Sequence, residues 1–317
     1  MRIKLITPAL ASARNGNSIT AIRCARILQQ LGHRVVMEQT YDGKGCDLMI
    51  ALHALRSHES IRLFKEMHPD LPLVVALTGT DLYRDIRINP DAQRSLELAT
   101  RLIVLQPMGI VELPKHLRAK TRVIYQSAAR VRRRSTPAKD GCFNVCVISH
   151  LRPEKDPLRT AMAARELPDS SRLRVLHIGR PLSKEMDRRL RAEIARNPRF
   201  RWLGELPHWK TRRILADSQL LSVTSRMEGS SNALCEAIAS SVPVVASKIP
   251  GLVGTLGKKY LGYFPVGKTR ELARLLQRIE SNPEFYCRLK AHCARLSPLA
   301  EPKREITAWK ELLRELV

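Results

Sequence analysis

The sequence predicts an α/β protein with two doubly wound, parallel-sheet domains that face a central cleft. In both halves of the chain, short apolar runs alternate with segments whose apolar residues recur at helical spacing. This alternation is typical of parallel sheets that helices cover on both faces. A polar, arginine-rich stretch interrupts the pattern near the middle, and 317 residues are enough for two domains.

The first half contains six expected strands and three expected helices. The helical pattern is clearest where Ala21, Ala25, Leu28 and Leu31 recur on one face before Gly32, which is placed to end the helix. The expected strands span residues 3–7, 34–37, 47–52, 73–77, 102–105 and 122–125, and the expected helices span residues 18–31, 57–67 and 91–99.

The alternation restarts after the arginine-rich stretch. Expected strands span residues 144–149, 173–178, 200–203, 220–224 and 244–246, and expected helices span 183–196, 209–216, 232–240 and, with breaks near Pro283 and Pro298, 270–316. We therefore divide the chain into a first domain (1–129), a basic linker (130–141), a second domain (142–300) and a C-terminal helix (301–317). We expect that last helix to pack toward the first domain.

Composition limits the class of protein. No run of about 18 apolar residues is present, so we expect no membrane-spanning helix. The chain starts like a strand rather than a signal peptide, which predicts a cytoplasmic location. The seven cysteines are scattered without a Cys-x-x-Cys pair, so reduced, mostly buried thiols are favoured over a zinc site. We expect no metal and no cofactor.

The formal net charge of +25 suggests anionic partners. An enzyme whose substrates carry phosphate ranks first, an arginine-rich solvated surface second, and a nucleic-acid-binding protein third. Aromatic residues make up only 4% of the chain, which weakens a model based on stacked bases. The oligomeric state stays open.

The segment with the strongest chemical signal runs from Ser225 to Ser247. A strand is followed by a Gly-Ser-Ser-Asn turn that opens a helix, and the free N–H groups of such a turn form an anion site. Glu228 and Glu236 flank this turn with seven residues between them. Carboxylates accept hydrogen bonds, so they suit the hydroxyl groups of a sugar or ribose rather than a phosphate. A capped helix with surface acids is the alternative.

A second segment places two cations after a strand. Arg152 and Lys155 follow the expected strand 144–149. Arginine grips two phosphate oxygens and lysine adds a compact charge, so the pair suits a departing diphosphate. Two surface cations are the alternative in so basic a chain.

Other polar groups follow strands in both domains. In an open α/β sheet, ligands bind at the carboxyl ends of the strands. A glycine turn at Gly16 opens the first helix, but it lacks the spacing of a dinucleotide fingerprint, so NAD is not inferred. The remaining groups in the second domain are Gly179 and Leu206; those in the first are Asn15, Asn17, Thr20, His53, Arg56, Thr78, Gly79, Thr80, Asp81, Arg84, Gln106 and Gln126.

The Glu-x7-Glu element, with its Pro-Val-Val-Ala strand and the Arg-x-x-Lys loop, resembles family 4 of the GT-B glycosyltransferases. The resemblance implies two Rossmann-like domains and a nucleotide-sugar donor. It implies that Glu228 contacts the transferred sugar and that Glu236 holds the donor ribose. Ser241 stands where the family usually has glycine, and Ser149-His150 replaces a usual Gly-Arg. The implied donor-binding residues are Gly16, Arg152, Lys155, Gly179, Leu206, Glu228, Gly229, Ser230, Ser231, Asn232 and Glu236, with Arg152, Lys155 and Glu228 catalytic.

First-domain strings carry a finer resemblance. Ile-Ala-Leu-His-Ala, Thr-Gly-Thr-Asp-Leu-Tyr-Arg-Asp and Val-Ile-Tyr-Gln-Ser together look like the selenosugar synthases of selenoneine biosynthesis. The implied activity transfers the hexosyl group of a UDP-sugar, typically UDP-N-acetylglucosamine, to selenophosphate, with loss of UDP and phosphate. The twelve first-domain residues from Asn15 to Gln126 then become acceptor-binding candidates, with Arg56 and Arg84 holding selenophosphate. A sugar, lipid or thiol acceptor, and a sugar epimerase of the same architecture, remain alternatives.

Overall fold

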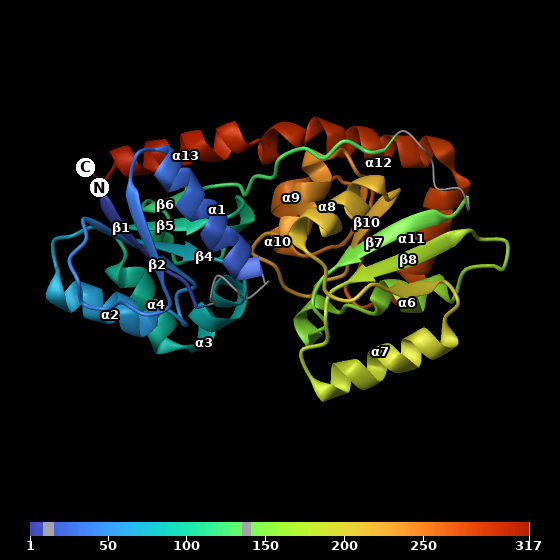
Figure 1. Ribbon diagram of the computed structural model, residues 1–317, viewed down its shortest axis with the longest axis horizontal. Helices are drawn as coiled ribbons and strands as arrows, with labels where there is room; N and C mark the ends of the chain where they lie inside the picture. Colours follow the sequence, from blue (N-terminus) through green and yellow to red (C-terminus); the bar gives the residue numbers. More distant parts are fainter. Residues whose placement is uncertain (9–15, 135–140, 317) are drawn as a thin grey trace. The chain divides into compact units, whose positions relative to one another are not determined.

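The computed structural model describes residues 1–8, 16–134 and 141–316, and these form two compact units (Figure 1). The first unit comprises Met1–Gln126, Glu228–Asn232 and Pro302–Val317, and the second comprises Ser127–Met227 and Ala233–Glu301. Each unit contains one parallel six-stranded sheet with helices around it. The predicted α/β class with two doubly wound sheets is therefore confirmed.

The sheet of the first unit has the strand order β2-β1-β3-β4-β5-β6. Its central strands β3 and β4 are apolar throughout and buried at every residue, as expected for a sheet covered on both faces. The strands are β1 Arg2–Ile6, β2 Arg34–Glu38, β3 Leu48–Leu52, β4 Leu73–Leu77, β5 Arg101–Val104 and β6 Thr121–Val123. The helices are α1 Gly16–Gln30, α2 His58–Met67, η1 Asp81–Asp85, α3 Ile86–Ile88, α4 Pro90–Leu98, α5 Met108–Val111, η2 Lys115–Leu117 and α13 Pro302–Arg314.

The C-terminal helix α13 belongs to the core of the first unit. Its Trp309, Leu312 and Leu313 are buried in one apolar cluster with Cys24 and Leu28 of α1, the helix beside which α13 lies in Figure 1. Burying a side chain of this size stabilises a fold by about 1.5–3 kcal/mol. The last helix is therefore an integral layer of the first unit.

The second sheet has the order β12-β11-β10-β7-β8-β9, so β7 lies between β10 and β8. Its strands are β7 Phe143–Ile148, β8 Leu173–Ile178, β9 Phe200–Trp202, β10 Leu220–Val223, β11 Val244–Ser247 and β12 Tyr263–Phe264. Its helices are η3 Pro153–Lys155, α6 Arg159–Ala164, α7 Lys184–Arg196, α8 His208–Asp217, α9 Asn232–Ala239, α10 Pro250–Leu256, α11 Thr269–Ser281, α12 Pro283–Arg295 and η4 Ser297–Ala300.

Local signals explain where several helices begin and end. Ser183 caps α7 by accepting a hydrogen bond from the Met186 amide, and Asn282 caps α12 in the same way ahead of Pro283. Ser241, two residues after α9, has a left-handed φ of 55°. That conformation disfavours a residue with a Cβ atom by about 1–2 kcal/mol, which accounts for the glycine usual at this position in the resembled family.

The structure differs from the sequence expectations mainly at short elements. The two-residue strand β12 and the π-helix η1 were not predicted, because neither is long enough to show a periodic pattern. Most other ends shift by one or two residues, as for the expected helix 18–31, which is Gly16–Gln30. No helix in the described residues is long and apolar enough to cross a membrane.

His177 is a fully buried histidine on β8. Its Nε2 lies 3.0 Å from the carbonyl oxygen of Ser149, so Nε2 carries the proton and donates it. Its Nδ1 is buried without a hydrogen-bond partner in the described structure. Burial lowers the pKa of His177 to about 4, because a second ring proton would lie in the core.

This pKa makes the second unit acid-sensitive. Because the folded pKa of about 4 lies below the unfolded value of about 6.5, the unfolded state binds more protons between these pH values. Stability is therefore present above the unfolded pKa and is lost as the pH falls. We expect wild type to lose about 2 kcal/mol more unfolding free energy than His177→Gln between pH 7 and pH 5. The measurement is the unfolding free energy from denaturant titrations between pH 7 and pH 5. If wild type and His177→Gln lose the same free energy over this range, the prediction is contradicted. His116→Gln, at an exposed histidine, is the control and should follow wild type.

Candidate functional site

The Gly-Ser-Ser-Asn turn is buried and closely packed. Glu228, Ser230 and Ser231 each expose less than a tenth of their surface. A Cβ atom on Gly229 would come within 2.5 Å of the carbonyl oxygen of Thr78, so only glycine fits there. Both residues belong to the first of the two units. The turn is therefore a built part of the structure rather than a mobile surface loop.

Asn232 connects this turn to the start of α1. Its Oδ1 accepts a hydrogen bond from Arg23 at 2.9 Å, and its Nδ2 donates to the carbonyl oxygen of Gly16 at 3.3 Å. Arg23 also pairs with the buried Glu305 of α13. The structure thus brings together Gly16 and Asn232, two residues that were predicted separately. Arg23 and Glu305 were not predicted, because their pairing depends on contacts between distant parts of the sequence.

Arg152 and Lys155 lie in the loop that follows β7, and this loop is bound to the end of β10. The Thr224 hydroxyl lies 2.8 Å from the carbonyl oxygen of Asp156, and the Arg226 amide donates to the carbonyl of Glu154 at 2.8 Å. Because β7 and β10 are parallel neighbours, their carboxyl ends share one sheet edge. Both cations are half-buried there.

The loop after β8 also meets this edge. Gly179 has a φ of 145°, and a Cβ atom on it would lie 2.0 Å from the carbonyl oxygen of Ser149. Its own carbonyl accepts a hydrogen bond from Trp202 Nε1 at 2.7 Å. The His150 ring accepts from the Arg180 amide at 3.2 Å. Ser149-His150, which replaces the family's usual pair, therefore helps to pack the loops after β7 and β8 together.

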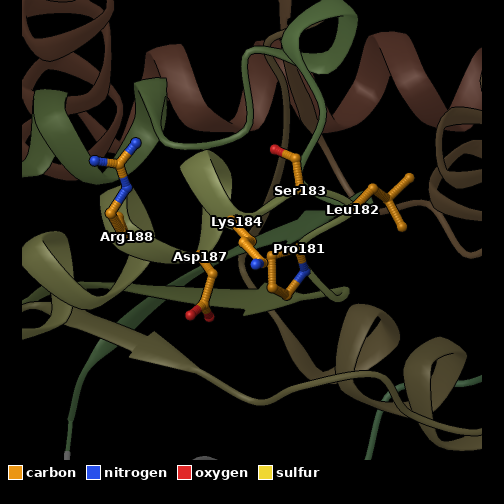
Figure 2. A pocket seen from close by; sticks show the side chains of 6 residues that line it. All are labelled: Pro181, Leu182, Ser183, Lys184, Asp187 and Arg188. Atoms are coloured by element: carbon orange, nitrogen blue, oxygen red, sulfur yellow. The ribbon is translucent and has the colours of Figure 1, made fainter.

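An open pocket lies just beyond Gly179, at the start of α7 (Figure 2). Its lining combines two cations and one acid with small and apolar side chains. The lining residues are Pro181, Leu182, Ser183, Lys184, Asp187 and Arg188. None of the residues predicted from the sequence to bind a ligand lines it.

Glu236 is a buried carboxylate on α9, with 6% of the residue exposed. Its Oε1 lies 2.6 Å from Nε2 of His208, the first residue of α8. The carboxylate also acts on Cys146 of β7: burial raises the pKa of that thiol to about 12, and the negative charge of Glu236 contributes to the rise. Sequence reasoning missed His208, because no spacing signal links residues 28 positions apart.

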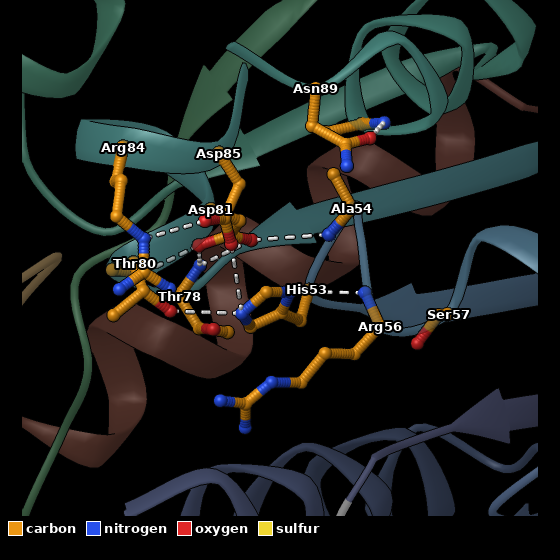
Figure 3. A network of polar contacts seen from close by, with 12 residues as sticks. His53, Ala54, Arg56, Ser57, Thr78, Thr80, Asp81, Arg84, Asp85 and Asn89 are labelled. Atoms are coloured by element: carbon orange, nitrogen blue, oxygen red, sulfur yellow. Dashed lines mark hydrogen bonds and ion pairs between the residues drawn. The ribbon is translucent and has the colours of Figure 1, made fainter. Parts of the chain in front are cut away.

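In the first unit, a polar network joins the ends of β3 and β4 (Figure 3). His53, directly after β3, is buried and has a left-handed φ of 76°. Its Nδ1 accepts a hydrogen bond from the Arg56 amide at 3.3 Å, which leaves the proton on Nε2. Nε2 therefore donates to the Thr80 hydroxyl at 2.9 Å and faces Asp85 at 3.8 Å. The strained backbone is typical of a functional position.

Asp81 connects the backbone of the two loops in the same network. Its carboxylate accepts hydrogen bonds from the amides of Thr78, Gly79 and Ala54 at 2.7–3.2 Å, and the residue is fully buried. These contacts hold the loop after β4 against the loop after β3. Asp81 therefore orders the loop that carries Thr80, and its predicted contact with an acceptor stays a prediction.

Two cations belong to this network. Arg84 Nε binds the Asp85 carboxylate at 2.8 Å, and Arg56 and Arg84 both have exposed side chains (Figure 3). Arg56 follows β3 and Arg84 follows β4, and the two strands are adjacent. The positive charge predicted from the sequence is thus present where these two strands end.

Gln106, Gln126 and Thr20, three other residues predicted in the first unit, have protein partners. Gln106 donates to the Tyr83 hydroxyl at 2.8 Å and accepts from the Met108 amide at 2.7 Å. Gln126 donates to Thr20 at 2.8 Å, while its Oε1 is buried without a partner in the described structure. Asn17 is half-buried on α1, and Asn15 lies outside the described residues.

Comparison with known proteins adds independent findings. The family model described as "Glycosyl transferases group 1" matches residues 130–295. A curated relative from Xenopus tropicalis, glycosyltransferase 1 domain-containing protein 1, is 23% identical over 325 residues, and the match covers 92% of each chain.

Solved structures resemble the whole chain. Anabaena HepE in complex with UDP and glucose has a TM-score of 0.77 at 17% identity, covering 99% of this chain and 100% of that one. Sucrose-phosphate synthase from Thermosynechococcus elongatus has a TM-score of 0.80 at 17% identity, covering 100% and 99%. At these identities, the likeness concerns the fold.

Proposed function

The chain belongs to the glycosyl transferases of group 1, and from this premise we propose that it uses a UDP-sugar donor, with UDP-N-acetylglucosamine as the first candidate. Its fold is GT-B, with two Rossmann-like sheets. The observation that carries the donor proposal is the shared edge of β7 and β10, where Arg152 and Lys155 lie beside the strand end that leads to Glu228. Anabaena HepE, which shares the fold, has a crystal structure in complex with UDP and glucose.

The proposed donor chemistry follows from these groups. As the bond between the sugar C1 and the diphosphate oxygen breaks, negative charge builds on the diphosphate. Arg152 and Lys155 stabilise that charge, which is the role of preorganised cations in a transition state. Glu228 accepts hydrogen bonds from the transferred sugar and Glu236 from the ribose. With two fixed cations in this role, the proposal includes no metal.

We propose selenophosphate as the acceptor. Selenophosphate is a small polyanion, and Arg56 and Arg84 carry the matching charge after β3 and β4. Selenium attacks the sugar C1 with its own electron pair, so a carbon–selenium bond forms while UDP leaves. Water then cleaves the selenium–phosphorus bond and gives the 1-selenosugar and phosphate. The first task of the site is therefore orientation rather than proton removal.

The product identifies the acceptor. We expect wild-type protein incubated with UDP-N-acetylglucosamine and selenophosphate to form a selenosugar with a selenium isotope pattern in mass spectrometry. Glu228→Ala and Arg152→Ala should each lower turnover by 100-fold or more, because each removes a charged group that stabilises the transition state. Unchanged unfolding curves would show that both variants are folded. Full turnover in either variant contradicts its donor role.

If wild-type protein forms no selenosugar, the release of UDP with other acceptors shows whether the donor proposal or the selenium proposal has failed. If UDP is released when a sugar, lipid or thiol acceptor replaces selenophosphate, the donor proposal holds and the selenium proposal is wrong. If no acceptor releases UDP, the donor proposal fails as well.

Arg84 provides a test of the acceptor site alone. We expect Arg84→Ala to raise the KM for selenophosphate by about tenfold or more, because an exposed cation that faces a polyanion contributes mainly to binding it. The KM for the UDP-sugar should change less than twofold. Arg87→Ala is the matched control, since Arg87 is a neighbouring exposed arginine paired with Glu112. Equal rises in both KM values for Arg84→Ala would contradict an acceptor role.

A further inference from the structure

The pair of His208 and Glu236 is a feature of the second unit that the family resemblance does not explain. Glu236 lies in α9 with only 8% of its side chain exposed, whereas 51% of the His208 side chain is exposed at the start of α8. The Nε2–Oε1 distance of 2.6 Å is shorter than that of an ordinary N–H···O hydrogen bond, and hydrogen bonds to a carboxylate are the shorter kind. A buried acid thus meets an imidazole that reaches it from the surface.

Glu236 needs such a partner. Removing a carboxylate from water costs several kcal/mol unless hydrogen-bond donors replace the lost hydration. In the described part of the chain, His208 is the side-chain donor that faces this carboxylate. The Cys146 thiol also interacts electrostatically with this carboxylate, and its pKa is raised to about 12 chiefly by burial. The thiol therefore stays neutral and supplies no positive charge.

The contact also leaves the carboxylate able to bind a ligand. A carboxylate offers about four lone-pair positions on its two oxygens, and His208 occupies one of them on Oε1. A diol needs acceptors at defined positions, and a carboxylate that rotates freely would present them only part of the time. Fixing the carboxylate in advance lowers the entropy cost of binding the diol.

We propose that His208 is a positioning residue for the ribose of the nucleotide: it holds the Glu236 carboxylate in the orientation that accepts the ribose hydroxyl groups. This inference rests on the proposed UDP-sugar donor. His208 acts through Glu236 and does not touch the reacting atoms. It opens α8 directly after the loop 203–207, so the same hydrogen bond also ties that loop to α9.

The chain provides a matched control. His116 Nε2 lies 2.8 Å from Glu97 Oε1 in the first unit, with 65% and 48% of the two side chains exposed. This is a histidine–glutamate pair of the same chemistry outside the proposed donor site. His116→Ala therefore removes the same kind of contact with no expected effect on nucleotide binding.

Calorimetric titration with two nucleotides tests the proposal. The ligands are UDP and 2′,3′-dideoxy-UDP, which lacks the ribose hydroxyl groups. We expect His208→Ala to weaken UDP binding by about 10- to 100-fold, the worth of a hydrogen bond to a charged group. The affinity for dideoxy-UDP should stay within twofold of wild type. His208→Gln, whose amide also donates, should keep UDP binding within about fivefold, and His116→Ala should bind both nucleotides as wild type does.

Three results would overturn the role of His208. Equal weakening of both nucleotides would mean that His208 supports the fold and does not position Glu236 for the ribose. Tighter UDP binding by His208→Ala would mean that the imidazole occupies the place of the ribose. Unchanged UDP binding would mean that the contact has no part in recognition. If wild type itself binds no UDP at millimolar concentration, the proposed donor is wrong, which is a separate outcome.

Discussion

The parallel pairing of β7 with β10 is the constraint on which the proposed donor chemistry depends. Parallel strands end on the same edge of a sheet, so the loops that follow them are neighbours although about 75 residues separate them in the sequence. The Thr224 hydroxyl and the Arg226 amide then hydrogen-bond the backbone of the loop after β7. Two cations thereby gain a fixed relation to the strand end that leads into the acidic turn.

Buried polar groups, rather than exposed ones, shape the candidate sites. Asp81 accepts three backbone hydrogen bonds, and His53 keeps a left-handed backbone between two strand ends. Such groups cost free energy unless all their partners are present, so they enforce one loop conformation. The exposed side chains that could meet a ligand belong to Arg56, in the loop after β3, and to Arg84, in η1, and both segments are ordered in this way. Rigid loops of this kind are what the orientation of a small polyanion requires.

The sequence predicted the fold class and most strands because short apolar runs rich in β-branched residues, such as Leu73–Leu77, favour strands that are buried on both faces. The strands Leu73–Leu77 and Leu173–Ile178 were predicted with the observed bounds. The strand Tyr263–Phe264 was missed, since two residues show no period. The predicted helix 183–196 begins one residue later, because Ser183 is the cap and not part of the helix.

The candidate sites were predicted less completely, for a physical reason. Motifs depend on spacing along the chain, and they therefore predicted Glu228, Glu236, Arg152 and Lys155 as donor-site residues, which stays a prediction. Contacts between segments that lie far apart in the sequence show no spacing pattern. The pairing of His208 with Glu236, and of Arg23 with Asn232 and Glu305, depends on where helices begin and on how they pack. The same limit explains why the hydrogen bonds from the Asp81 carboxylate to the backbone were not foreseen; its assignment to the acceptor site stays a prediction.

The most direct measurement is a crystal structure of the chain with UDP bound. The account predicts the diphosphate against Arg152 and Lys155 and the ribose hydroxyl groups on Glu236. A diphosphate held instead by Lys184 and Arg188 in the pocket at the start of α7 would contradict the central claim, because that pocket includes none of these residues.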